Sequence, residues 1–255
     1  MTLETVVVPC LSDNYAYLIR DSATGKVGVV DVPDEKPILA ALSARGWDLD
    51  MILITHHHYD HVDGVAPLRK ATNAVVVGSK DDAHRLPPLD MALKEGGEVA
   101  LGESRAKIID VSGHTINHIA FHFAEAGVVF TADSLMAMGC GRVFEGTMPM
   151  MWESLSKLAA LPPETQVYSG HEYTQSNTRF ALSIDGDNPD LIKRAADIDA
   201  ARAAKQPTVP SLLSLELATN PFLRASDPAI RAHLGMETAS DAEVFGEIRT
   251  RKDHF

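Results

Sequence analysis

The chain has 255 residues, of which 45% are hydrophobic and 23% charged, a balance typical of ordinary globular proteins and not of disordered ones. Its formal net charge of −12 argues against nucleic acid as a partner, and an anionic substrate would need a local basic patch. No apolar run is long enough to span a bilayer, the first residues lack a signal-peptide pattern, and two cysteines make no disulfide framework, so we expect a cytoplasmic protein without a membrane partner.

Short apolar runs between turn residues predict a mixed α/β organisation for the first two thirds of the chain. The expected strands are Leu3–Pro9, Tyr15–Arg20, Val27–Val32, Met51–Thr55, Ala74–Val77, Glu98–Leu101, Lys107–Val111, Ile119–Phe123, Val128–Thr131 and Gln166–Ser169. The expected helices are Pro37–Arg45, Val65–Arg69, a short helix from Ser79, and Met151–Leu161. We therefore predict an α/β domain over residues 1–171.

The pattern changes after His171, where we find amphipathic helical stretches and no strand pattern. The expected helices are Tyr173–Ile184, Pro189–Lys205, Ser211–Thr219, Pro228–Leu234 and Ala239–Arg251. Prolines between residues 207 and 210 and at Pro221 separate three of them. These features predict a helical second domain over residues 172–255.

Four histidines and one aspartate lie within six residues, directly after the expected strand Met51–Thr55. His56 and His58 are two residues apart, so an extended backbone points both to one face, where they can bind one ion. Asp60 and His61 follow as the chain turns into a helix, so they should face a second ion. Imidazole and carboxylate without thiolate suit zinc, iron or manganese, and no HExxH tetrad is present.

Three later residues each follow an expected strand in the same manner, namely His114, Asp133 and His171. If those strands share one sheet, their ends meet at the edge that carries the histidine cluster. Seven ligands suit two ions better than one tetrahedral ion. We assign His56, His58 and His114 to one ion and Asp60, His61 and His171 to the other, with the Asp133 carboxylate bridging both.

The remaining histidines are expected not to bind metal. They are His57, His84, His118, His122, His233 and His254. His118 is the main alternative ligand, since it lies four residues from His114.

The pattern Thr55-His56-x-His58-x-Asp60-His61, with single later ligands at strand ends, resembles the metallo-β-lactamase superfamily. This resemblance implies an αββα sandwich with a binuclear site at the sheet edge. Four segments, residues 52–61, 139–147, 170–174 and 249–253, together look like the glyoxalase II family of hydroxyacylglutathione hydrolases. That family adds a helical C-terminal domain and hydrolyses the thioester S-D-lactoylglutathione to D-lactate and glutathione, a step of methylglyoxal detoxification.

The glyoxalase II resemblance also implies a set of glutathione-binding residues, which here are Arg142, Phe144, Tyr173, Arg249 and Lys252. Arg142 stands where the family usually has lysine, which keeps the charge and changes its geometry. Phe144 stands where the family has tyrosine, so one hydrogen bond worth roughly 0.5–1.5 kcal/mol should be missing. Arg249 and Lys252 are three apart on an expected helix and share a face, which supplies the basic patch that an acidic chain needs.

The expected mechanism is attack on the thioester by hydroxide formed at the two divalent ions, most simply zinc, with iron or manganese as alternatives. Asp60 would ligate one ion and orient the nucleophile, while Cys140 would only pack. A monomer is expected. Rival hypotheses are a persulfide dioxygenase-like oxidoreductase with one iron, another hydrolase of the superfamily such as a lactonase or β-lactamase, and a non-catalytic glutathione- or metal-binding module.

Overall fold

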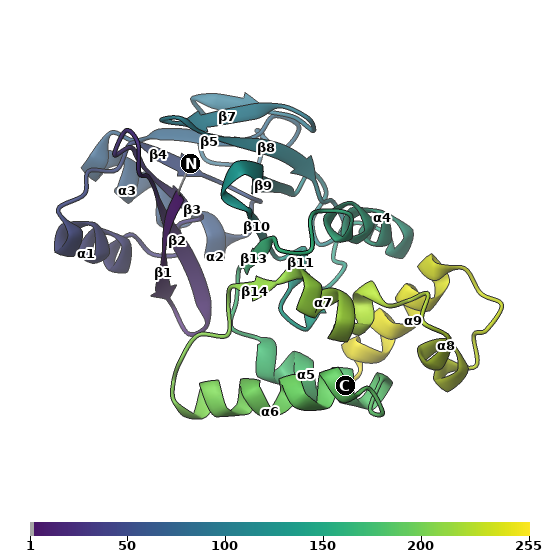
Figure 1. Cartoon of the computed structure of the whole chain (residues 1–255). Coiled ribbons are helices and arrows are strands. Elements are labelled where there is room, and N and C mark those ends of the chain that lie inside the picture. Colours follow the sequence, from purple (N-terminus) through teal and green to yellow (C-terminus); the bar gives the residue numbers. More distant parts are fainter. Residues whose placement is uncertain (1–2) are drawn as a thin grey trace. The chain divides into compact units, whose positions relative to one another are not determined.

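The computed structural model describes residues 3–255, which form two compact units (Figure 1). The first unit contains the chain up to residue 111 together with residues 116–131, and the second contains residues 112–115 and 132–255. A division between domains at residue 171 therefore stays a prediction. Among residues 3–255, no helix combines the length and the apolar character needed to cross a membrane.

The first unit is built on a six-stranded sheet whose strands follow one another in chain order. They are β1 (Leu3–Cys10), β2 (Asn14–Asp21), β3 (Val27–Val30), β4 (Met51–Leu53), β5 (Val75–Ser79) and β6 (Met91–Leu93). Strands β1 to β3 pair antiparallel, whereas β3 to β6 pair parallel. Strand β3 is buried at every position, as expected for a strand covered on both faces.

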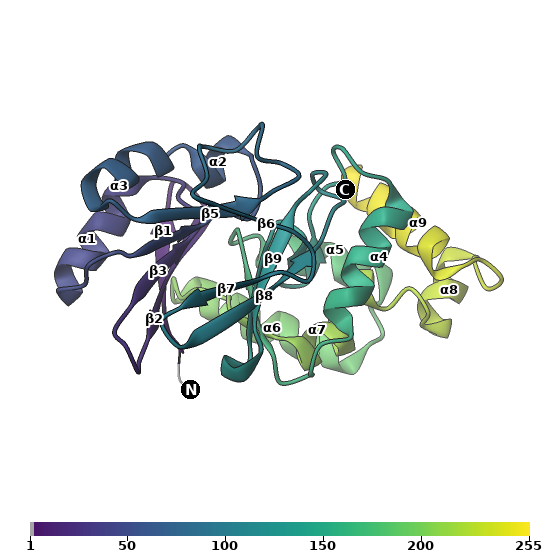
Figure 2. The same ribbon diagram turned by 90° about the horizontal axis from the view of Figure 1, so that it is seen from above.

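Helices cover one face of this sheet (Figure 2). They are α1 (Glu35–Arg45) and α3 (Val65–Thr72), with the single-turn helix α2 (Tyr59–Val62) between β4 and α3. Ile38 and Leu42 of α1 and Leu68 of α3 share one buried cluster with Ile52 and Val76 of the sheet. Burial of these apolar side chains stabilises the layer.

A second antiparallel layer completes the first unit, in the order β7, β8, β9, β10. These strands are β7 (Glu98–Leu101), β8 (Ser104–Asp110), β9 (Ile119–Phe123) and β10 (Val128–Ala132), with the 3-10 turn η1 (Ala124–Ala126) between the last two. The Tyr17 ring of β2 lies 5.5 Å from the Phe130 ring of β10. The Asp21 carboxylate at the end of β2 accepts hydrogen bonds from the backbone amides of Glu103 and Ser104. The two layers therefore pack face to face as a sandwich.

The second unit is mostly helical. Its helices are α4 (Met148–Ala159), α5 (Thr174–Ile184), α6 (Pro189–Ala203), α7 (Leu213–Thr219), α8 (Pro228–Leu234) and α9 (Asp241–Asp253), with the 3-10 turn η2 (Pro221–Leu223). Its short strands are β11 (Leu135–Met136) paired with β12 (Gly139–Cys140), and β13 (Gln166–Ser169) paired with β14 (Ser211–Leu212). Met138, Ala181, Leu191 and Ile198 form a buried cluster of this unit.

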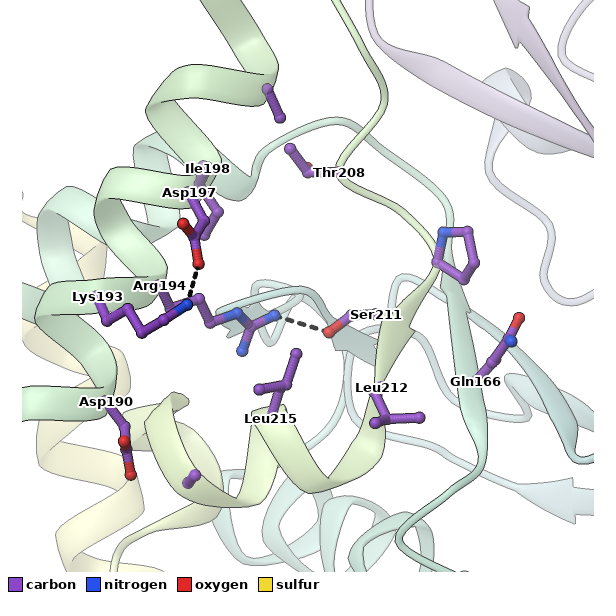
Figure 3. A pocket seen from close by; sticks show the side chains of 13 residues that line it. Gln166, Asp190, Lys193, Arg194, Asp197, Ile198, Thr208, Ser211, Leu212 and Leu215 are labelled. Carbon is purple, nitrogen blue, oxygen red and sulfur yellow. Dashed lines mark hydrogen bonds and ion pairs between the residues drawn. The ribbon is translucent and has the colours of Figure 1, made fainter.

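A buried ion pair joins several elements of the second unit. The Arg194 guanidinium of α6 donates to the Glu216 carboxylate of α7 and, at 2.7 Å, to Ser211 Oγ and Thr219 Oγ1. Figure 3 shows Arg194 pointing toward Ser211 beside a pocket of about 660 Å³. Glu216 also accepts from the backbone amide of Met138 at 2.9 Å. Because each buried charge has partners, this cluster is structural.

Two predicted elements were wrong. No helix starts at Ser79: residues 80–87 form turns, because Pro87 and Pro88 stop helix propagation within two turns. The region after residue 171 also contains strand β14, in which Ser211 and Leu212 pair with Val167 and Gln166. The sequence predicted a helix from Ser211, but the helix starts at Leu213, after this two-residue strand.

Candidate metal centre

The first unit brings together the four ligands predicted in the histidine cluster. Residues 54–58 are neither helix nor strand, and the ligand nitrogens of His56 and His58 lie within 4.8 Å of each other. Helix α2 carries Asp60 and His61, and Asp60 Oδ2 lies 3.8 Å from His61 Nε2. His56 and His61 are fully buried. This group can present three imidazoles and one carboxylate to cations.

Two buried residues that the sequence reasoning missed orient these ligands. Asp31 accepts hydrogen bonds from the Thr55 amide and hydroxyl, and its Oδ2 lies 2.8 Å from His61 Nδ1. This contact assigns the His61 proton to Nδ1, so the lone pair that a metal requires is on Nε2. Asn14 donates to Asp60 Oδ2 at 3.0 Å and to the Asp60 carbonyl at 3.1 Å.

The second unit brings together the other three predicted ligands, all of them buried. Asp133 Oδ2 lies 3.4 Å from His114 Nε2 and 3.3 Å from His171 Nε2. The Asp133 carboxylate therefore stands between two imidazoles, as a bridging ligand would. His171 follows β13, and the amide of Gly170 next to it donates to the carbonyl of Ala132, the residue before Asp133, so His171 and Asp133 are held close together.

Close backbone approach positions His114 and Asp133. His114 Nδ1 lies 2.7 Å from the carbonyl oxygen of Arg142, which places the proton on Nδ1 and turns Nε2 toward Asp133. A Cβ atom at Gly141 would lie 1.9 Å from the Asp133 carbonyl oxygen and 3.0 Å from His114 Nδ1. Only glycine fits at residue 141, so the segment after β12 is part of the ligand support.

The chemistry of this donor set fits a dinuclear centre of divalent metal. The first unit offers three imidazoles and one carboxylate, and the second offers two imidazoles and one carboxylate. Neither Cys10 nor Cys140 competes as a ligand or nucleophile, because burial raises the pKa of each thiol to about 11. His118, the alternative ligand, is buried with its ring stacked 4.5 Å from that of His56.

The predicted glutathione-binding residues all lie in the second unit, and two of them occupy the segment after β12. Arg142 is 55% exposed, its Nε lies 3.1 Å from Asp253 Oδ1, and its guanidinium stands 5.8 Å from the Phe144 ring. Phe144 is 60% exposed and makes an edge contact with His114. Tyr173 is exposed, and its ring is stacked on His171 at 4.6 Å.

The two basic residues of helix α9 differ in exposure. Arg249 is buried and donates to the Cys140 carbonyl at 2.9 Å and to Asp253 Oδ1 at 3.1 Å. Lys252 donates to the Ser176 carbonyl at 3.3 Å and stands 5.2 Å from the Phe180 ring. Burial, with Arg249 and Arg179 nearby, lowers the pKa of Lys252 to about 8. Asp253 accepts from both Arg142 and Arg249 and was not identified from the sequence.

Comparisons with known proteins agree with this architecture. A family described as the metallo-beta-lactamase superfamily matches residues 6–171, and the hydroxyacylglutathione hydrolase C-terminus matches residues 172–255. A relative named hydroxyacylglutathione hydrolase, from Ruegeria pomeroyi, is 63% identical over the whole of both chains. A crystal structure of TTHA1623 in a di-iron-bound form is 26% identical, with a TM-score of 0.62 over 86% of this chain and all of that chain.

The BLEG-1 B3 metallo-beta-lactamase structure is 18% identical, has a TM-score of 0.66 and covers 87% of this chain and 99% of its own, which shows the fold alone. The predicted fold class, a metallo-β-lactamase fold followed by a helical C-terminal region, is confirmed. The chain belongs to the hydroxyacylglutathione hydrolase family of the metallo-beta-lactamase superfamily.

Proposed function

We propose that this protein hydrolyses the thioester S-D-lactoylglutathione to D-lactate and glutathione, as a glyoxalase II. The observation that carries this proposal is the identity of 63% along the whole chain with a relative named hydroxyacylglutathione hydrolase. The match of residues 172–255 to the C-terminus of that family distinguishes this chain from other hydrolases with the same fold.

The proposed metal centre consists of the seven predicted ligands around two cations. His56, His58 and His114 would hold one ion, and Asp60, His61 and His171 would hold the other. Asp133 would bridge them, which its position between His114 and His171 supports. Zinc is the proposed metal; the di-iron form of TTHA1623 keeps iron as the first alternative, and manganese accepts the same donors.

Divalent cations held by these residues lower the pKa of coordinated water and polarise a carbonyl oxygen, which is the chemistry that thioester hydrolysis requires. The chain's own contribution is to orient the ligands. Asn14 fixes the Asp60 carboxylate, and Asp31 fixes His61, so the reacting groups are held before the substrate arrives. A thiolate leaves readily, so no strong general acid is needed. Burial raises the pKa of the Cys10 and Cys140 thiols, so neither is suited to act as a nucleophile.

We propose that glutathione binds through residues of the second unit. Arg142 and Lys252 would face its carboxylates, Tyr173 would contact its backbone, and Phe144 would pack against it. Arg249 would support this subsite from the buried side, through Cys140 and Asp253. These cations supply the local positive charge that an anionic substrate needs on a chain of net charge −12. The assignment of residues 172–255 as the substrate-binding domain remains a prediction. The cytoplasmic location and the monomeric state also remain predictions.

The test is hydrolysis of S-D-lactoylglutathione by purified protein, with the metal content measured on the same sample. We expect turnover with two equivalents of divalent metal, and loss of turnover after chelation that added zinc restores. Oxygen uptake with glutathione persulfide is the control for the oxidoreductase hypothesis, and we expect none. Protein that carries two metal equivalents and leaves the thioester intact would contradict the proposal.

A further inference from the structure

His57 lies between two predicted metal ligands and has its own set of partners in the first unit. Its Nδ1 lies 3.2 Å from Asp82 Oδ2, and its Nε2 lies 3.5 Å from Arg85 Nη1. Asp82 is fully buried, whereas the His57 side chain is 18% exposed. The His57 ring also makes an edge contact with the His58 ring, with 5.1 Å between the ring centroids.

Both ring nitrogens of His57 lie beside charged side chains of the turns at residues 80–87. The Asp82 carboxylate stands at ion-pair distance from Nδ1, and the Arg85 guanidinium stands beside Nε2. These contacts hold the His57 ring against the turns.

The Asp82 carboxylate is itself held in place. Arg85 Nε donates to Asp82 Oδ1, and Arg85 Nη2 donates to the Ile116 carbonyl at 2.8 Å. The side chain of Asn117 donates to the Asp81 carbonyl at 3.1 Å. The turns around residues 80–87 and 116–117 are therefore tied together, and His57 is attached to a fixed point of the first unit.

We infer that Asp82 is a positioning residue that acts through His57 to hold His56 and His58 in the geometry that binds metal. Residues 54–58 form no helix or strand, and backbone hydrogen bonds hold this segment at Ile54, Thr55 and His58, so the contacts of the His57 side chain fix the segment between them. Outer-shell partners of this kind typically change metal affinity by about 10–100-fold when they are removed. The inference rests on the metal centre of the proposed function and adds a residue pair outside the seven ligands.

The experiment compares zinc affinity and apoprotein stability in three variants. His57→Leu removes the contact with Asp82. His57→Asn keeps a polar group beside the Asp82 carboxylate. His84→Leu is the matched control, since it removes an exposed histidine from the same turn region. Zinc affinity is measured by competition with a chromophoric chelator, and stability by thermal unfolding of each metal-free protein.

We expect His57→Leu to bind the first zinc about 10–100-fold more weakly than the wild type. We expect His57→Asn to retain most of the affinity and His84→Leu to equal the wild type, with similar apoprotein melting temperatures in all four proteins. Asp82→Asn, tested as a second route to the same contact, should weaken zinc binding in the same direction.

Two results would overturn the inference. One is wild-type zinc affinity in His57→Leu, and the other is equal weakening in His57→Asn and His57→Leu, which would make the contact with Asp82 irrelevant. A wild-type protein that binds no zinc would overturn both the inference and the proposed centre. A wild type that binds two zinc ions and leaves lactoylglutathione intact would contradict the proposed function alone, because the affinity comparison needs no substrate.

Discussion

The predicted metal ligands and the predicted glutathione contacts differ in how firmly the protein holds them. His56 and His61 are fully buried, and Asp31 fixes His61. Arg142 and Phe144, in contrast, are 55% and 60% exposed. A metal ligand displaced by a fraction of an ångström loses its bond, whereas an exposed side chain can readjust to a flexible peptide. We therefore expect the second group to tolerate substitution better than the first.

The largest effect should come from Asp133, the carboxylate between His114 and His171. We expect Asp133→Ala to reduce kcat/KM at least about a thousandfold and to lower the metal content, because the carboxylate proposed to bridge the two ions is removed. Steady-state hydrolysis and metal analysis on the same sample check this. An active variant with full metal content would remove Asp133 from the centre.

The next effect should come from Asp31, which has a left-handed backbone at φ 56°. Asparagine tolerates that conformation, so Asp31→Asn changes the carboxylate with little backbone strain. We expect metal affinity to fall about 10–100-fold, since His61 loses the partner that fixes its tautomer. The metal affinity is measured by competition with a chelator. An unchanged affinity would show that His61 is oriented by other contacts.

On the exposed side of the comparison, Arg142→Met should raise KM about tenfold and leave kcat within about twofold, because a charge-assisted hydrogen bond to bound substrate is lost. Arg105→Met, at an exposed arginine of strand β8, is the matched control and should leave KM unchanged. A fall in kcat as large as the rise in KM would mean that Arg142 acts on the reacting groups.

Lys252 gives the subsite a pH dependence. Its pKa is lowered to about 8, so it loses its charge as pH rises through that value and stops attracting a substrate carboxylate. We expect KM to stay flat below pH 7 and to rise about fivefold by pH 9. Lys252→Arg should make KM flat over this range, since arginine keeps its charge. A pH profile of KM that is the same in both proteins would exclude Lys252 as the cause.

The smallest effect should come from Phe144→Tyr, which adds the hydroxyl that the family has at this position. We expect KM to fall about threefold, which corresponds to the binding free energy of one neutral hydrogen bond at an exposed site. The measurement is KM for S-D-lactoylglutathione at fixed pH. A higher KM would mean that the contact between the Arg142 guanidinium and the Phe144 ring matters more than the hydroxyl.

The sequence predicted the seven ligands because each follows a strand and histidine is too rare to cluster by chance. Asp31 follows β3 in the same manner, but the strand expected at Val27–Val32 extended past it, so that rule did not find it. Asn14 and Asp82 could not be found, since an asparagine or aspartate next to a turn is ordinary, and only the fold brings Asn14 to Asp60 and Asp82 to His57. Strand β14 was missed because its pairing partner lies more than forty residues away, at Gln166 and Val167.

The central claim is that the seven predicted ligands hold one pair of cations. Anomalous diffraction from zinc-loaded crystals tests it most directly. We predict two peaks about 3.5–4 Å apart, one contacting His56, His58 and His114, the other Asp60, His61 and His171, with Asp133 touching both. Peaks far apart, or zinc bound by only some of these seven residues, would contradict the account.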